Sequence, residues 1–359
     1  MKNKRIGKVI LCLLAVCTMS GCGDKKTEHN GISQQAPEHM KEELEPYLNV
    51  DAEVAADQPE ELYSYQATHV MPDGEKLKEA FMPEEECDTE YDAEFDRYNC
   101  RSKDGKKRAS TVLGARFSDQ EYSYYYVLTS TGDVDHMYPE SFPDLPTQKE
   151  LPFADKKKAA ETVRETAQKL DIILDEEPFV FEGLDAECLS GLYEKELEVT
   201  GGERLQQVFP DFQVQPDMEC YYMLWRVLAP HGERLRNGNR DAGGVLERNG
   251  AYVTAIYTSS GMVHFHANAT FQYEEEQAVS QILSVDAALE QVKKQYENVI
   301  LTEKDAITIT EISLDYVPVL RNIEKKSYDI LPAWCMYGRS GGGDFPFFVM
   351  VDAQTGEIL

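Results

Sequence analysis

Apolar and β-branched residues recur in three similar stretches of the chain, and each stretch predicts a β-hairpin. Each has a β-rich run, a short turn that contains a glycine, and a second β-rich run: residues 124–137, 252–266 and 347–359. β-branched and aromatic side chains suit a pleated, half-buried surface, and glycine can adopt the positive φ that tight hairpin turns require. Alignment on Gly132, Gly261 and Gly356 predicts an internal repeat in three copies. Three unrelated hairpins are the alternative, because such turns are common.

Two of these hairpins follow a helical pattern. Ser284 can cap a helix in which apolar residues recur on one face: Val285, Ala288, Leu289, Val292 and Tyr296. A similar stripe follows residue 153: Ala160, Val163, Ala167 and Leu170. Strand-like segments at 178–184 and 221–228, and at 307–320 and 328–337, lie between each helix and its hairpin. We therefore expect an α+β protein of two or three modules, each a helix packed on an antiparallel β-sheet. A further short helix is expected over residues 39–47.

Composition and pattern together divide the chain into five parts. Residues 1–21 are a signal peptide, and residues 22–37 are polar, too poor in apolar groups to offset the entropy of ordering, and so form a flexible tether. An N-terminal α+β module is expected over 38–150, a middle module with a glycine-containing insertion over 151–282, and a C-terminal module over 283–359.

The first residues indicate export and lipid attachment. Basic residues precede an apolar run at 9–16, which is typical of a secretory signal, and this run is shorter than the roughly 20 residues of a transmembrane helix. The segment Met19-Ser20-Gly21-Cys22 resembles the lipobox of bacterial lipoproteins. That resemblance implies that Cys22 is acylated, for example with palmitate, and anchors the protein to the outer face of the cell membrane. An ordinary secretory signal with a chance cysteine is the alternative.

The charge of the chain excludes one class of partner. The sequence holds 65 acidic and 36 basic residues, a net charge of −29, and removal of the basic signal peptide makes the remainder more acidic still. Such a surface repels nucleic acid and anionic lipid headgroups and favours cations or basic partners. Binding of DNA or RNA is therefore excluded, and solubility is the simplest role of the charge.

Five cysteines follow Cys22, an odd number, so at least one is unpaired outside the cell. We expect disulfides between Cys87 and Cys100 and between Cys188 and Cys220, with buried free thiols as the alternative. No C-x-x-C pair occurs, so the spacing indicates neither a zinc ribbon nor a thioredoxin-type motif.

The last module resembles a known family. Residues 284–359, which begin SVDAALEQVKK and end VMVDAQTGEIL, look like the PepSY domain of secreted bacterial proteins, over roughly a fifth of the chain. The whole chain is also similar to uncharacterised lipoproteins of low-GC Gram-positive bacteria. PepSY domains are associated with the regulation of secreted peptidases and with envelope signalling. The resemblance therefore implies a non-catalytic role and transfers no catalytic residue.

Several motifs that could carry chemistry have a simpler structural interpretation. Residues 338–342 match G-x-S-x-G, but another strand follows where a nucleophile elbow needs a helix, which favours a glycine-rich hairpin loop. His264 and His266 share one side of a strand and could bind zinc or copper if a third ligand converged, yet a solvent-facing strand is the simpler interpretation. The acidic stretch 84–96 lacks the spacing of an EF-hand calcium loop. We assign no metal ligand, cofactor or catalytic residue.

Tyrosines gather at 122–126 and at 221–222 beside Trp225. Aromatic strands can bind sugars or peptides, and they are equally common in ordinary sheets. The sequence as a whole predicts a non-catalytic cell-surface lipoprotein that binds or regulates a secreted or envelope protein or peptide. An envelope hydrolase with a site invisible in sequence, and a small-ligand or carbohydrate receptor, are the alternatives.

Overall fold

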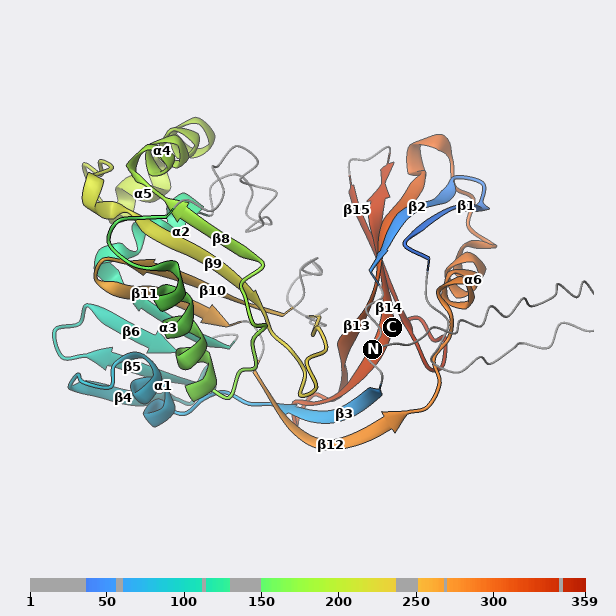
Figure 1. Cartoon of the computed structure of the whole chain (residues 1–359), viewed down its shortest axis with the longest axis horizontal. Coiled ribbons are helices and arrows are strands. Elements are labelled where there is room, and N and C mark those ends of the chain that lie inside the picture. Colours follow the sequence, from blue (N-terminus) through green and yellow to red (C-terminus); the bar gives the residue numbers. More distant parts are fainter. Residues whose placement is uncertain are drawn as a thin grey trace, which may run out of the picture.

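The computed structural model describes residues 37–55, 61–111, 114–129, 150–236, 251–267, 270–341 and 345–359. The strands of these residues form two antiparallel-rich sheets that lie side by side, with helices on their faces (Figure 1). The α+β class predicted from the sequence is confirmed. Cys22, Gly132 and residues 130–149 lie outside the described residues.

An eight-stranded sheet is built from two consecutive meanders. Each meander follows a helix: α1 (Gly74–Phe81) precedes the first and α3 (Lys156–Lys169) precedes the second. The last strands of the two meanders pair with each other, so the sheet order is β4-β5-β6-β7-β11-β10-β9-β8. The strands are β4 (Cys87–Asp92), β5 (Arg97–Ser102), β6 (Lys107–Ser110), β7 (Ala115–Asp119), β8 (Val180–Leu184), β9 (Cys220–Arg226), β10 (Tyr252–Thr258) and β11 (Gly261–Ala267).

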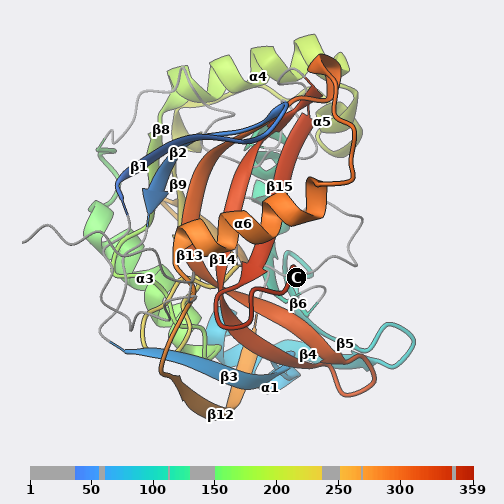
Figure 2. The same cartoon turned by 90° about the vertical axis from the view of Figure 1, so that its right-hand side faces the viewer.

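A seven-stranded sheet forms the other half. Its order is β1-β2-β13-β14-β3-β12, with β15 also paired to β14. The strands are β1 (His39–Glu45), β2 (Leu48–Ala55), β3 (Leu62–His69), β12 (Phe271–Val279), β13 (Ile307–Asn322), β14 (Ser327–Ser340) and β15 (Phe345–Asp352). The helix α6 (Val285–Tyr296) lies across one face of this sheet (Figure 2).

The predicted repeat of helix and antiparallel strands is present, but its first copy lies elsewhere in the chain. The three copies are α1 with β4–β7, α3 with β8–β11, and α6 with β13–β15, where Ile358 adds a bridge to Val351. In each copy a glycine with positive φ precedes or begins the last strand segment: Gly114 (118°), Gly261 (100°) and Gly356 (77°).

The hairpin expected over 124–137 is therefore wrong in its described part, which is the helix α2 (Tyr124–Thr129). Its buried residues pack together with those of other helices, because a helical face brings neighbouring turns onto one side. Tyr125 and Leu128 are almost fully buried in this cluster.

The predicted helix over 39–47 is also wrong, because this segment is β1. Met40 and Leu44 are buried while most residues around them are exposed, a pattern that fits a strand with one face on the core. The chain then reverses at a turn over Pro46 and Tyr47 and pairs antiparallel with β2. The charged residues between Met40 and Leu44 are exposed on this edge strand of the sheet.

The helix capped by Ser284 is confirmed. The Ser284 hydroxyl accepts a hydrogen bond from the Ala287 amide at 3.3 Å. The predicted apolar face of α6 is buried against the seven-stranded sheet, next to Ile309, Trp334 and Val351. The predicted stripe of α3 is buried in the same way at Val163 and Ala167.

The two sheets do not follow the expected division into three consecutive modules. Strands β3 and β12 pair with each other in the seven-stranded sheet, and the whole eight-stranded half lies between them in sequence. At the crossing the Val70 amide donates to the Thr270 carbonyl at 3.0 Å. The stretch 38–150 therefore supplies β1–β3 to one sheet and β4–β7 to the other.

Three helices cover the second face of the eight-stranded sheet over β8–β10. They are α2, α4 (Ala186–Thr200) and α5 (Glu203–Val208), the last two inserted between β8 and β9. Leu189, Leu192 and Leu205 pack here against Tyr222 and Leu224. Short 3-10 turns lie at Gln120–Tyr122, Pro216–Met218 and Glu303–Asp305.

A buried ion pair joins the two sheets. After β9 the chain reaches β13, where the Arg236 amide donates to the Tyr316 carbonyl at 2.7 Å. The Arg236 side chain donates from Nε to Asp315 Oδ2 at 2.7 Å and lies 4.7 Å over the Tyr337 ring. Asp315 is fully buried and Arg236 nearly so. Each of these two buried charges is therefore neutralised by a residue from the other half of the molecule.

The glycine at 338 is required by a close backbone approach. A Cβ atom at this position would lie 2.0 Å from the Thr308 carbonyl oxygen of β13. We expect Gly338→Ala to lower the free energy of unfolding by ~1–3 kcal/mol, as over-packing does. Urea titrations followed by circular dichroism measure this change. Gly191→Ala is the control, because a Cβ there meets no atom within 4 Å in the helix α4. Equal stability of the two variants would contradict this explanation.

Candidate functional site

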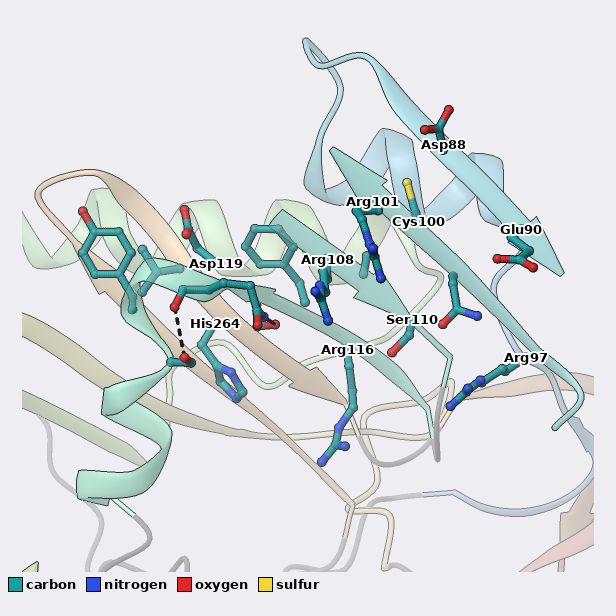
Figure 3. Close-up of a pocket in the computed structure, with 18 of the residues that line it drawn as sticks. Asp88, Glu90, Arg97, Cys100, Arg101, Arg108, Ser110, Arg116, Asp119 and His264 are labelled. Carbon is teal, nitrogen blue, oxygen red and sulfur yellow. Dashed lines mark hydrogen bonds between the residues drawn. The ribbon is translucent and has the colours of Figure 1, made fainter. Parts of the chain in front are cut away.

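An open groove of about 880 Å³ lies on the eight-stranded sheet, over β5, β6 and β7 (Figure 3). Alternate residues of these strands face opposite sides. Cys100, Ala109 and Phe117 belong to the core cluster that includes α1 and α3, so the residues between them face the groove.

Polar side chains run in two rows across the face of the sheet that forms the groove. In each row, neighbouring residues lie directly opposite each other on adjacent strands, so their side chains lie close together. The first row, across β5, β6, β7 and β11, consists of Arg101, Arg108, Ser118 and His264. The second consists of Asn99, Ser110, Arg116 and His266.

The basic residues of this region fall into two groups. Residues 97–116 contain seven basic residues and one acidic residue, in a chain that is otherwise strongly acidic. Four of the seven form ion pairs: Arg97 with Asp92, Lys103 with Asp88, Lys106 with Glu121, and Lys107 with Glu85.

The other three are Arg101, Arg108 and Arg116, which line the groove. Among the residues that the structure describes, none of the three guanidinium groups has a hydrogen bond or an ion pair. Arg101 and Arg108 lie directly opposite each other on β5 and β6, and like charges in that position destabilise a sheet by a fraction of a kcal/mol to about 1 kcal/mol. An anion between the guanidinium groups would remove this repulsion. The arrangement can therefore bind a carboxylate or a similar anion.

Two histidines of β11 end the two rows: His264 lines the groove and is half-buried, and His266 is buried. Burial lowers the pKa of His264 to about 4, with a smaller effect of Arg116 in the same direction. Burial, Arg116 and His264 lower the pKa of His266 to about 3. The solvent-facing strand expected for this pair is thus wrong, because His266 is buried and His264 is half-buried at the side of the groove. Both rings are neutral at neutral pH and leave the positive charge of the groove to the arginines.

The groove ends where the helical cover begins. Its wall at this side is formed by Tyr122 and Ser123, just before α2, and by Val263. Beyond them the same face of the sheet becomes apolar, with Tyr222 and Ile256 in the row that starts at Arg101. One sheet face is therefore half apolar and covered, and half basic and open.

The cysteines predicted to pair lie near their partners. Burial, followed by the nearby Cys87, raises the pKa of Cys100 to about 12. Burial and the proximity of Cys188 raise the pKa of Cys220. Cys335 is buried in β14 of the seven-stranded sheet, far in sequence from all of these. The two disulfides remain predictions.

The other motifs found in the sequence are structural in the described residues. Gly338, Arg339 and Ser340 are part of β14 rather than of a turn that leads into a helix. Tyr221, Tyr222 and Trp225 are fully buried, so they form no exposed aromatic surface. Among the described residues, no three His, Cys, Asp or Glu side chains come together in a way that could hold a metal ion. None of the described helices is long and apolar enough to cross a membrane.

Sequence reasoning missed the arginine groove. A signal was present, because seven of the basic residues lie within twenty positions of an acidic chain and alternate in part with apolar ones. What the sequence did not show is which of them are neutralised by neighbouring carboxylates, since three of the four ion pairs join residues 15 or more positions apart.

Comparisons with known proteins give the fold. No family model and no curated protein matches the chain. Among solved structures it is similar to an uncharacterized protein from Eubacterium rectale ATCC 33656, with 17% identity, a TM-score of 0.58 and coverage of 90% of this chain and 93% of that one. This likeness shows the fold alone. The C-terminal domain of Bacillus megaterium YpeB is a distant neighbour, with 8% identity, a TM-score of 0.28 and coverage of 81% and 96%.

The two buried histidines predict a loss of stability in mild acid. The unfolded chain binds protons at these residues near pH 6.5, whereas the folded chain does so only near pH 4 and 3. The free energy of unfolding should therefore fall as the pH drops from about 6.5 towards 4. In urea titrations at pH 7 and pH 5, we expect His264→Gln/His266→Gln to lose less stability between the two pH values than the unsubstituted protein.

His231→Gln is the matched control. The hydrogen bond that the His231 ring donates to Glu276 raises the pKa of His231, so removal of this ring should not reduce the acid loss. An unchanged pH dependence in the double variant would show that the buried rings do not cause it.

The expected disulfides can be tested by chemical labelling. We expect alkylation of the exported, unfolded protein without reductant to label Cys335 alone, because Cys87–Cys100 and Cys188–Cys220 are oxidised outside the cell. Mass spectrometry of the peptides before and after reduction measures this directly. Labelling of all five cysteines without reductant would instead support buried free thiols.

Proposed function

We propose that this protein is a non-catalytic, lipid-anchored binding protein on the outer face of the bacterial cell membrane, and that the groove over β5–β7 holds a protein or peptide partner. The observation that carries this proposal is the set of three arginines that line the groove without a described ion-pair partner, Arg101, Arg108 and Arg116. The four other basic residues of the same segment are neutralised inside the chain.

The charge of the whole protein strengthens this argument. A net charge of −29 keeps most anions away. The arginines attract an anionic partner only if it fits into the groove. An anionic partner that contacts only the acidic outer surface is repelled. Electrostatic complementarity of this kind contributes to specificity and to the rate of association.

The fold supports a PepSY-like origin for the modules. Each copy places a helix before an antiparallel meander, which is the arrangement that the resemblance of residues 284–359 implies. Regulation of a secreted peptidase or of an envelope sensor would be consistent with that family. The lipobox-like segment that ends at Cys22 supports lipid anchoring.

Site-specific photo-crosslinking in intact cells tests the proposed function. A photoreactive amino acid at Ser110, in the second row of the groove, should capture one envelope protein or peptide in near-stoichiometric amount. The same group at Glu161, exposed on α3 on the opposite face of the sheet, is the control and should not. Cys22→Ala should release the protein from the membrane fraction. The proposal fails if Ser110 captures nothing, or if both positions capture the same set of proteins.

A further inference from the structure

We infer that the partner docks through an acidic segment, about as wide as one helix, that lies on β5–β7 in the position that α4 and α5 take on the other half of the sheet. This inference rests on the proposed function and adds the chemistry and the position of the contact. It follows from three observations on the internal repeat and the groove.

The first observation is the symmetry of the eight-stranded sheet. The meanders β4–β7 and β8–β11 each follow a helix, those two helices contact each other, and β7 pairs with β11 at the centre. The two copies are thus related by an approximate two-fold axis. The face of β5–β7 that forms the groove is the counterpart of the face that α4 and α5 cover in the second copy.

The second observation is the difference between the copies. In the second copy, residues 185–219 between β8 and β9 form α4 and α5, which fold back over their own strands. In the first copy, the equivalent connection between β4 and β5 is a four-residue turn at 93–96. The first copy therefore has no insertion of its own at this point, and the described residues leave a groove of about 880 Å³ there.

The third observation is the chemistry of the two faces. The covered face is apolar, with Leu224 and Ile256, and binds apolar helices. The groove instead presents Arg101, Arg108 and Arg116, whose planar guanidinium groups suit carboxylates. A segment that replaces α4 and α5 on this face must accordingly carry acidic side chains where those helices carry leucines.

The width of the basic strip argues against an extended polyanion. Three adjacent strands span ~10 Å, close to the 10–12 Å diameter of a helix with its side chains. Asp88, Glu90 and Asp92 on the edge strand β4 also line the groove. Asp88 and Asp92 pair with Lys103 and Arg97, whereas the carboxylate of Glu90 would repel a second row of anionic groups. A single segment with acidic residues on one side fits the width of three strands and places no second row of anionic groups near β4.

A peptide selection tests this inference and does not require an identified partner. The probe is a displayed library of random peptides of about 12 residues, which is about 18 Å as a helix, selected on the lipid-free exported chain. We expect the enriched peptides to hold an excess of Asp and Glu. Fluorescence polarisation with the enriched peptides should show binding that weakens as salt is raised.

Matched variants locate the contact. Arg101→Gln/Arg108→Gln/Arg116→Gln should weaken binding of the selected peptides by about tenfold or more, because charged hydrogen bonds are lost. Lys157→Gln/Lys158→Gln/Arg164→Gln removes the same charge from exposed positions of α3 on the opposite face and should change it by less than about twofold. Replacement of the three arginines by lysine keeps the charge but not the planar fork, and should give an intermediate loss. Thermal unfolding confirms that each variant is folded.

Several results would overturn the inference. Enrichment of neutral or basic peptides, no enrichment at all, or equal loss in the two glutamine variants would each refute an acidic segment at this site. Inorganic phosphate that competes as well as the selected peptides would indicate a small anion instead. Light scattering that shows a dimer lost only in the groove variant would indicate a second copy of this chain. A partner captured at Ser110 by the groove variant as well as by the parent would leave the proposed function standing and refute the acidic contact.

Discussion

The buried pair of Arg236 and Asp315 fixes the relation between the two halves of the molecule. Asp315 belongs to β13 of the seven-stranded sheet, and Arg236 lies after β9 of the eight-stranded sheet. Loss of either partner would leave a charged group buried without compensation, which costs ~3–5 kcal/mol. The segment can therefore meet β13 only in the register that aligns both groups. The strands β3 and β12, which precede and follow the eight-stranded half in sequence, also pair with each other. Together with this pairing, the ion pair holds the two sheets in one arrangement.

Within that frame, one structural unit has acquired three different surfaces. The copy with α6 packs its helix on one face of the seven-stranded sheet, the copy with α3 covers its second face with α4 and α5, and the copy with α1 leaves its second face open and basic. Because all three share the order of a helix followed by antiparallel strands, much of the difference lies in insertions and in the side chains that face outward. Function is carried by such faces and not by the fold that presents them.

The groove also shows how an acidic protein can maintain a local positive charge. Most basic residues of the segment 97–116 are neutralised by carboxylates on neighbouring strands and turns. Arg108 and Arg116 escape this neutralisation because an arginine, serines and a histidine lie opposite them across the strands. Asp88 lies opposite Arg101 on β4 but pairs instead with Lys103. Burial keeps His264 and His266 uncharged, so the positive charge of the groove does not change with protonation of these rings near neutral pH.

Local patterns in the sequence determined the α+β class, the helix that Ser284 caps, the buried stripe of α3 and the hairpin at Gly261, because each depends on residues a few positions apart. The edge strand β1 was predicted to be a helix because it is short and rich in charged residues. The first copy of the repeat was placed too late in the chain because the tyrosine-rich helix α2 has the local composition of a strand. Only the tertiary structure decided which strands share a sheet, and that β3 and β12 pair across the eight-stranded half that separates them in sequence. It also decided which three arginines have no carboxylate partner among the described residues. These are consequences of pairing between residues far apart in the chain, and the sequence alone does not state which distant residues meet.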